Sequence, residues 1–79
     1  MKTVKIRLSS IEAVRNFVEI VRKFEGDIDL SSGRYIVDAK SIMGIFSLDL
    51  MNPITLTAHC DDCDKLLESL KDYIVDWSE

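Results

Sequence analysis

The sequence has one histidine, one proline and three glycines among its 79 residues. Its two cysteines are too few for a disulfide framework. The apolar residues never form an uninterrupted run long enough for a signal peptide or a membrane span, so we expect a cytoplasmic protein without a membrane partner. The formal net charge of -4 argues against the basic surface that nonspecific nucleic-acid binding requires. We therefore expect no direct nucleic-acid partner.

The composition is that of an ordinary globular chain, with 47% hydrophobic and 30% charged residues. A chain of this length forms one hydrophobic core and leaves no room for a second one. No repeat, linker or low-complexity segment divides the sequence. We therefore expect a single domain over residues 1–79.

The first third of the chain predicts a strand followed by a helix. Apolar and polar residues alternate over Thr3–Leu8, the pattern of a half-buried strand. Ser9 followed by Glu12 matches a capping box. Apolar residues then recur at helical spacing from Ile11 until Gly26, where we expect the helix to stop.

The middle of the chain predicts a hairpin and a short helix. Residues 27–30 and 34–37 alternate on either side of Ser31-Ser32-Gly33, which supplies a turn. Ser41 is placed to cap the next helix. Gly44 weakens that helix, and Asn52-Pro53 ends it.

The last third predicts a fourth strand over residues 54–58 and a final helix. Asp61 or Asp62 would cap this helix, whose apolar stripe consists of Cys63, Leu67, Leu70, Ile74 and Trp77. The order is then βαββαβα. It predicts an α+β fold in which helices cover one face of a four-stranded antiparallel sheet, an open-faced β-sandwich.

The single histidine and both cysteines of the chain lie in one short segment, residues 59–63. His59, Cys60 and Cys63 are three soft ligands at the entry of the last helix, and the spacing of the cysteines also suits redox exchange. A structural zinc site has four ligands, and the sequence has no further Cys or His. We expect reduced thiols and no metal or other cofactor, with these three residues as weak candidates.

The segment 37–48, which reads VDAKSIMGIFSL, resembles the corresponding segment of the HPr family, the small histidine-phosphorylated carriers of the bacterial sugar phosphotransferase system. Its core, Ala39 to Gly44, is the most specific part of the match. From Phe17 onward the chain follows the family pattern with little or no gapping. The resemblance implies the same open-faced fold that the periodicity predicts.

The resemblance also shows what is missing. In this family a histidine at the start of the first helix is phosphorylated by enzyme I, and a nearby arginine steadies the phosphoryl group. Counting back from Phe17 places the histidine position at Ser10 and the arginine position at Glu12. A serine phosphate ester is too stable for reversible transfer, and Glu12 would repel a phosphoryl group. The chain thus resembles a degenerate member, similar to the catabolite-repression HPr-like proteins.

Ser41 occupies the place of the family serine that an ATP-dependent HPr kinase phosphorylates. The resemblance implies that the phosphoprotein then acts with a catabolite-control transcription factor. A phosphate at a helix start meets oriented N–H donors, with Lys40 adjacent. The alternative is that Ser41 serves as an N-cap and nothing more, and both roles are compatible.

The short helix after Ser41 is unusually apolar, which suggests a partner-binding surface. In the family this surface docks enzyme I, the kinase and other partners, and we assign it to Lys40, Ile42, Met43 and Phe46. The alternative is that Ile45 and Leu48 belong to the core and that only Met43 or Phe46 is exposed, by chance.

Together these features predict a noncatalytic regulatory protein of the phosphotransferase system and of carbon catabolite control, regulated through Ser41. It would not be an enzyme, and its partners would be phosphotransferase-system components, the HPr kinase or the transcription factor. The main alternative is a working phosphocarrier with an unusual acceptor, for which His59 is the only imidazole. A third is a small scaffold recruited for another interaction, because fold alone does not fix function.

Overall fold

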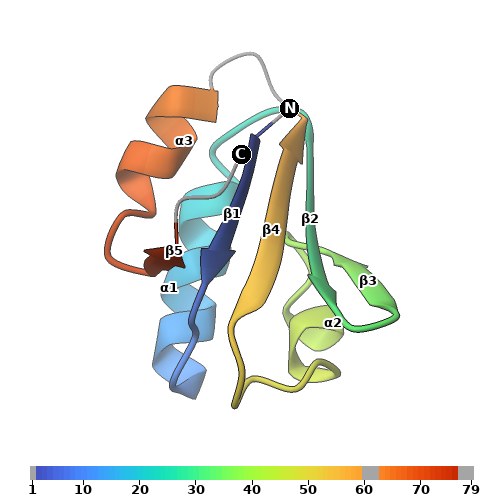
Figure 1. Cartoon of the computed structure of the whole chain (residues 1–79). Coiled ribbons are helices and arrows are strands. Elements are labelled where there is room, and N and C mark those ends of the chain that lie inside the picture. The colour runs from blue at the N-terminus through green and yellow to red at the C-terminus, as the bar shows by residue number, and fades with distance from the viewer. Residues whose placement is uncertain (1, 60–62, 77–79) are drawn as a thin grey trace.

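One antiparallel sheet organises the molecule in the computed structural model, which describes residues 2–59 and 63–76. In these residues the sheet has five strands in the order β3-β2-β4-β1-β5, and Figure 1 shows α1, α2 and α3 behind it. The strands are β1 (Lys2–Ile6), β2 (Asp27–Ser32), β3 (Tyr35–Asp38), β4 (Ile54–His59) and β5 (Ile74–Asp76). The helices are α1 (Ile11–Val21), α2 (Ile42–Phe46) and α3 (Cys63–Ser69).

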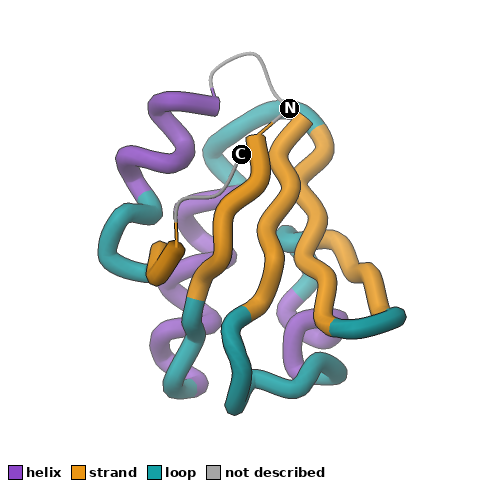
Figure 2. The backbone as a smooth tube through the Cα atoms, in the orientation of Figure 1, coloured by secondary structure: helices purple, strands orange, loops and turns teal. Residues whose placement is uncertain are grey.

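The predicted arrangement of a sheet with one covered face is confirmed. Val4 and Ile6 of β1 and Leu56 of β4 are buried under the helices, whereas Lys5 is exposed on the other face. Figure 2 shows that face of the central strands without a helix over it. Phe17 is the largest fully buried side chain, and it packs edge to face against Tyr73 with 6.0 Å between ring centroids. None of the helices in the described ranges is long and apolar enough to cross a membrane.

The prediction of four strands is wrong, because the chain ends its last helix at Ser69 and adds a fifth strand. The N–H of Tyr73 donates to the carbonyl of Leu70 at 2.8 Å and closes a turn. Ile74 then pairs with Ile6 of β1. The spacing of Leu70 and Ile74 also fits the apolar stripe of a helix. The two consecutive β-branched residues Ile74 and Val75 favour a strand instead. The other residue assigned to that stripe, Trp77, lies outside the described residues, as do Asp61 and Asp62.

The start and end of α1 also differ from the prediction. Ser10, and not Ser9, is the N-cap, because its Oγ accepts from the N–H of Ala13 at 3.0 Å. Glu12 is therefore one position too early for a capping box. The helix ends at Val21, and Gly26, with a φ of 107°, reverses the chain into β2.

Ser41 caps α2 as predicted, since its Oγ accepts from the N–H of Gly44 at 3.2 Å. The helix has 5 residues and ends at Phe46, well before Asn52-Pro53. The Ser47 hydroxyl donates to the carbonyl of Gly44 and closes its last turn.

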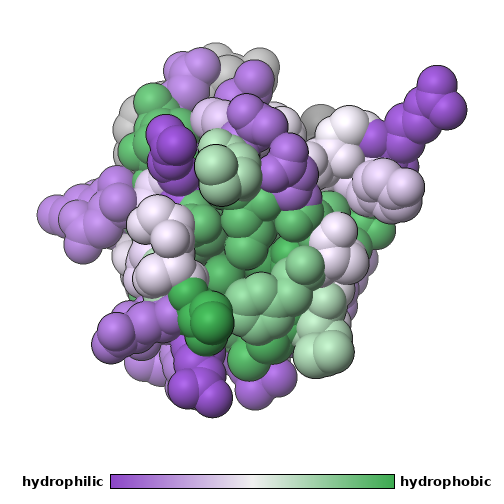
Figure 3. Space-filling model, turned by 90° about the horizontal axis from the view of Figure 1, so that it is seen from below, coloured by the Kyte–Doolittle hydropathy of each residue, from purple (hydrophilic) through white to green (hydrophobic). Residues whose placement is uncertain are grey.

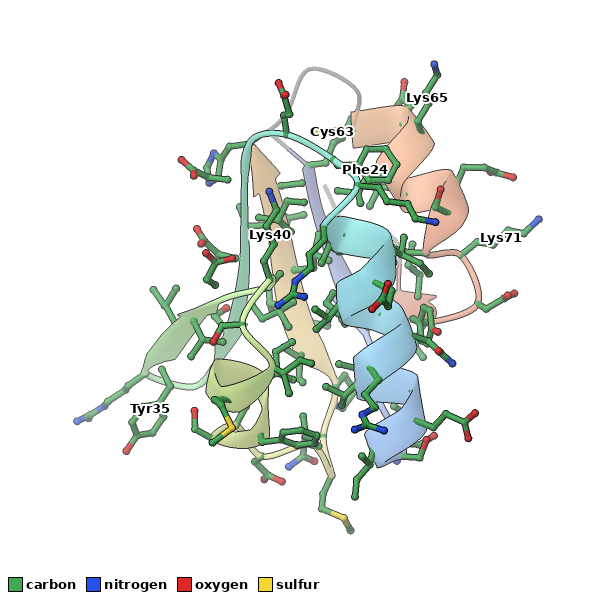
Figure 4. The ribbon with its side chains drawn as sticks, turned by 180° about the vertical axis from the view of Figure 1, so that it is seen from behind. Phe24, Tyr35, Lys40, Cys63, Lys65 and Lys71 are labelled. Carbon is green, nitrogen blue, oxygen red and sulfur yellow. The ribbon has the colours of Figure 1, made fainter. Side chains whose placement is uncertain are left out.

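Lys40 ties the segment before α2 to the end of α1. Its ammonium donates to the carbonyl of Phe24 at 2.8 Å and to that of Gly26 at 3.3 Å. Figure 4 shows Lys40 extending toward the segment that carries Phe24. A cation beside carbonyls just beyond a helix end also interacts favourably with the helix dipole. Lys40 therefore has a structural role.

We expect Lys40→Met to lower the free energy of unfolding by about 1–2 kcal/mol, because the side chain keeps its stem but loses charged hydrogen bonds to two carbonyls. Urea unfolding measures the change. Lys65→Met, at an exposed lysine of α3 (Figure 4), is the matched control and should leave stability within about 0.5 kcal/mol. Equal effects of the two substitutions would contradict the proposed role of Lys40.

Candidate functional site

A hollow of about 470 Å³ lies where β1 leads into α1. It is lined by residues 7–11, by Phe46 at the end of α2 and by residues 48–51 of the following loop. Three segments that are distant in the sequence therefore meet at this end of the sheet. The hollow is the best candidate for a binding site among the described residues.

The rim of the hollow is apolar and accessible. Ile11 is 67% exposed, Phe46 40% and Met51 80%. Figure 3, which views the molecule from this end, shows apolar side chains gathered in the middle of the face with hydrophilic groups around them. An exposed apolar patch with a polar border is typical of a protein-binding surface.

The loop beside the hollow is held in place by Asp49. Its carboxylate accepts from the N–H of Met51 at 3.0 Å and from the side-chain amide of Asn52 at 2.9 Å. Arg7 contributes from the opposite side, where its guanidinium donates to the carbonyl of Met51 at 3.5 Å. A guanidinium thus reaches the hollow from the residue after β1.

Ser10 brings a hydroxyl to the wall of the hollow, at the start of the longest helix. Its backbone is extended, with a φ of -152°, and its Oγ accepts from Ala13. The only imidazole of the sequence, on His59, is at the other end of the sheet. The pairing of β1 with β4 fixes this separation, because Lys2 lies opposite Ala58 whereas Ile6 lies opposite Ile54.

Ser41 lies outside the hollow, at the other end of α2 from Phe46, and it is half-buried. A Cβ at Gly44 would lie 3.2 Å from the Oγ of Ser41 and 3.2 Å from the Cβ of Val37. Glycine at this position therefore leaves space around the hydroxyl and lets α2 approach β3. One short helix connects Ser41 with the apolar rim.

The four residues that the sequence assigns to the partner surface lie in different environments in the structure. Met43 is 80% exposed and Phe46 lines the hollow. Ile42 is half-buried and packs against the core. The ammonium of Lys40 is bound to carbonyls beyond α1. Ile45 and Leu48 are buried, as the alternative interpretation of this helix holds, although both Met43 and Phe46 are exposed.

Among the described residues, the weak metal candidates His59 and Cys63 do not belong to a group of metal ligands. His59 is exposed at the end of β4, whereas Cys63 is buried and its Sγ is 3.7 Å from the carbonyl oxygen of Ala58. Cys60 lies outside the described residues. In residues 2–59 and 63–76, no three His, Cys, Asp or Glu side chains are grouped to hold a metal ion.

Sequence reasoning missed Arg7, Ile11 and Met51 as parts of the site. The helical spacing places Ile11 in the apolar stripe of α1, but it is the first residue of the helix and is exposed. Met51 had a visible signal, since it is a large apolar residue in a loop, two positions before Pro53. Arg7 falls on the polar side of the alternating segment Thr3–Leu8, a position that local pattern assigns to the exposed face of the strand.

The comparisons agree on one family. The family model described as the PTS HPr component phosphorylation site matches residues 10–76. No curated protein matches the chain.

Solved structures match over nearly the whole chain. HPr-C-His from Thermoanaerobacter tengcongensis is 33% identical, with a TM-score of 0.80 over 91% of this chain and 89% of the other. The phosphocarrier protein HPr from Bacillus anthracis is 33% identical, with a TM-score of 0.69 over 92% and 93%. The catabolite repression protein Crh from Bacillus subtilis is 32% identical, with a TM-score of 0.68 over 89% and 82%. With the family model matching from the N-cap of α1 into β5, the chain belongs to the HPr family.

Proposed function

We propose that this chain is a noncatalytic, regulatory member of the HPr family that acts by binding other proteins. Its docking surface would consist of the exposed side chains around the hollow and on α2. We define this docking surface as Ile11, Met43, Phe46 and Met51. Phosphorylation of Ser41 would regulate it within carbon catabolite control.

The side chain at the N-cap of α1 is the observation that carries this proposal. Ser10 holds the place that the resemblance assigns to the phosphorylated histidine, and it offers a hydroxyl where the carrier reaction needs an imidazole. A histidine nitrogen titrates near neutrality and forms a labile phosphoramidate, whereas a serine ester is stable. His59 is separated from Ser10 by the length of β4, so it cannot replace the missing group.

The position of Ser41 supports a regulatory phosphate. It keeps the family's serine within the Ala39–Gly44 segment and begins α2, which carries Met43 and leads to Phe46. A phosphate there would add nearly two negative charges beside the docking surface. It would therefore attract partners with a positively charged contact surface and repel partners with a negatively charged one. The likeness to Crh, which is named for catabolite repression, favours the same kind of function.

We expect an HPr kinase with ATP to place an acid-stable phosphate on Ser41. Ser41→Asn keeps a capping side chain but removes the hydroxyl, so it should abolish labelling while the protein stays folded. Ser10→Ala is the control for the other N-cap and should be labelled like the wild type. Mass spectrometry locates the phosphate, and labelling that persists in Ser41→Asn would contradict this assignment.

Enzyme I with labelled phosphoenolpyruvate tests the loss of carrier chemistry. We expect no acid-labile label on the wild type, because the described hollow holds no imidazole. Ser10→His should accept acid-labile phosphate, because it restores a nitrogen nucleophile at the N-cap of α1 in a hollow that Arg7 also lines. Acid-labile label on the wild type would support a working phosphocarrier instead.

We expect Met43→Gln to weaken binding of the HPr kinase and to raise the Kd about tenfold, because it removes an exposed apolar contact of the docking surface. The side chain is 80% exposed, so the thermal midpoint should not change. Val75→Thr, at an exposed apolar residue of β5, is the control and should bind like the wild type. Calorimetric titration gives Kd, and unchanged binding by Met43→Gln would remove this residue from the docking surface.

A further inference from the structure

The outer edge of β3 has no neighbouring strand among the described residues. β3 is the last strand on its side of the sheet, and Figure 1 shows nothing beyond it. A sheet edge presents a row of backbone N–H and C=O groups that can pair with another strand.

The register of the hairpin shows which backbone groups face outward. Ser32 and Tyr35 flank the two-residue turn Gly33-Arg34, so they form a hydrogen-bonded pair, and Leu30 and Val37 form the next one. The backbone groups of Tyr35 and Val37 are thus directed toward β2. Those of Ile36, between them, are directed outward.

The side chains along the edge of β3 leave it accessible to pairing with another strand. Ile36 is 71% exposed and Tyr35 is 70% exposed. The strand is short and ends in a charged residue, but it contains no proline, no lysine and no bulge, three of the devices that protect an edge. Figure 4 shows Tyr35 at the outer end of the hairpin, beyond α2.

We propose that two copies of this chain associate antiparallel through β3, with Ile36 opposite Ile36 of the second copy on the two-fold axis. In this register the two Ile36 residues exchange N–H to C=O hydrogen bonds, which satisfies the backbone groups that face outward. Tyr35 lies opposite Val37 of the second copy on the helix-covered face.

The same register pairs opposite charges. Arg34 lies directly across from Asp38 of the second copy, and the two-fold axis repeats the pair at the other end. Both residues are exposed and lie on the open face together with Ile36. The carboxylate of Asp38 accepts from the N–H of Lys40 at 2.8 Å through one oxygen, which fixes its orientation. A register that centres on Asp38 would instead bring two carboxylates together.

This dimer would be weak, because a strand of 4 residues buries far less surface than the roughly 1,200 Å² of a stable interface. The two-fold axis is perpendicular to the sheet, so both sets of helices would lie on the same side. The proposal is independent of the regulatory function, since it uses neither Ser41 nor the hollow.

Hydrogen exchange and sedimentation test the association on the whole chain. At millimolar concentration we expect exchange of the Ile36 amide to slow with increasing protein, while exchange of the Val37 amide, already bonded to β2, stays the same. Sedimentation velocity should show a rapid monomer–dimer equilibrium that weakens as salt is raised, because salt screens the two Arg34–Asp38 pairs.

Ile36→Lys places like charges on the axis, and Arg34→Asp places carboxylates opposite each other at both ends. Each should raise the dimer Kd at least about tenfold. Val75→Lys, on the opposite edge of the sheet, is the matched control and should dimerise like the wild type. Either a chain that remains monomeric at millimolar concentration or a dimer unaffected by Ile36→Lys and Arg34→Asp would overturn the proposal.

Discussion

The antiparallel pairing of β1 with β4 is the constraint on which the rest of the molecule depends. These two strands form the centre of the sheet over five residue pairs, from Lys2–Ala58 to Ile6–Ile54. Their buried side chains form the layer on which the helices pack, so a shift of one residue would turn that layer toward solvent. The same pairing places the start of α1 at one end of the sheet and His59 at the other. The separation of Ser10 from the single imidazole is thus built into the strand register.

In the proposed function, the fold keeps its docking surface although the residue that caps α1 is a serine and not a histidine. The hollow is formed where β1, α1, α2 and the loop before β4 converge, and its apolar rim does not depend on which residue caps α1. A surface of this kind can bind partners without transferring a group to them. This separation of binding from chemistry explains how one scaffold can serve as carrier and as regulator.

Much of this structure could be predicted from the sequence. Period-two alternation located β1, β2, β3 and β4, and the resemblance over residues 37–48 identified the family. The errors came from local ambiguity. Leu70 and Ile74 fit a helix as well as a turn followed by a strand, and Ser9 and Ser10 both suit a cap. Of the site residues that the sequence singles out, Ser10 and Phe46 line the hollow. Arg7, Ile11 and Met51 join them only through the tertiary fold, which no local pattern encodes.

The bonds that Lys40 makes have a consequence for any modification of its neighbour. Its ammonium is held by carbonyls just beyond α1, and it is also the cation next in sequence to Ser41. A dianion on that hydroxyl would compete with the carbonyls of Phe24 and Gly26 for the same positive charge. If the ammonium changed partner, the segment between α1 and β2 would lose both of these hydrogen bonds. A covalent change at the start of α2 would then alter a distant turn through the displacement of a single counterion.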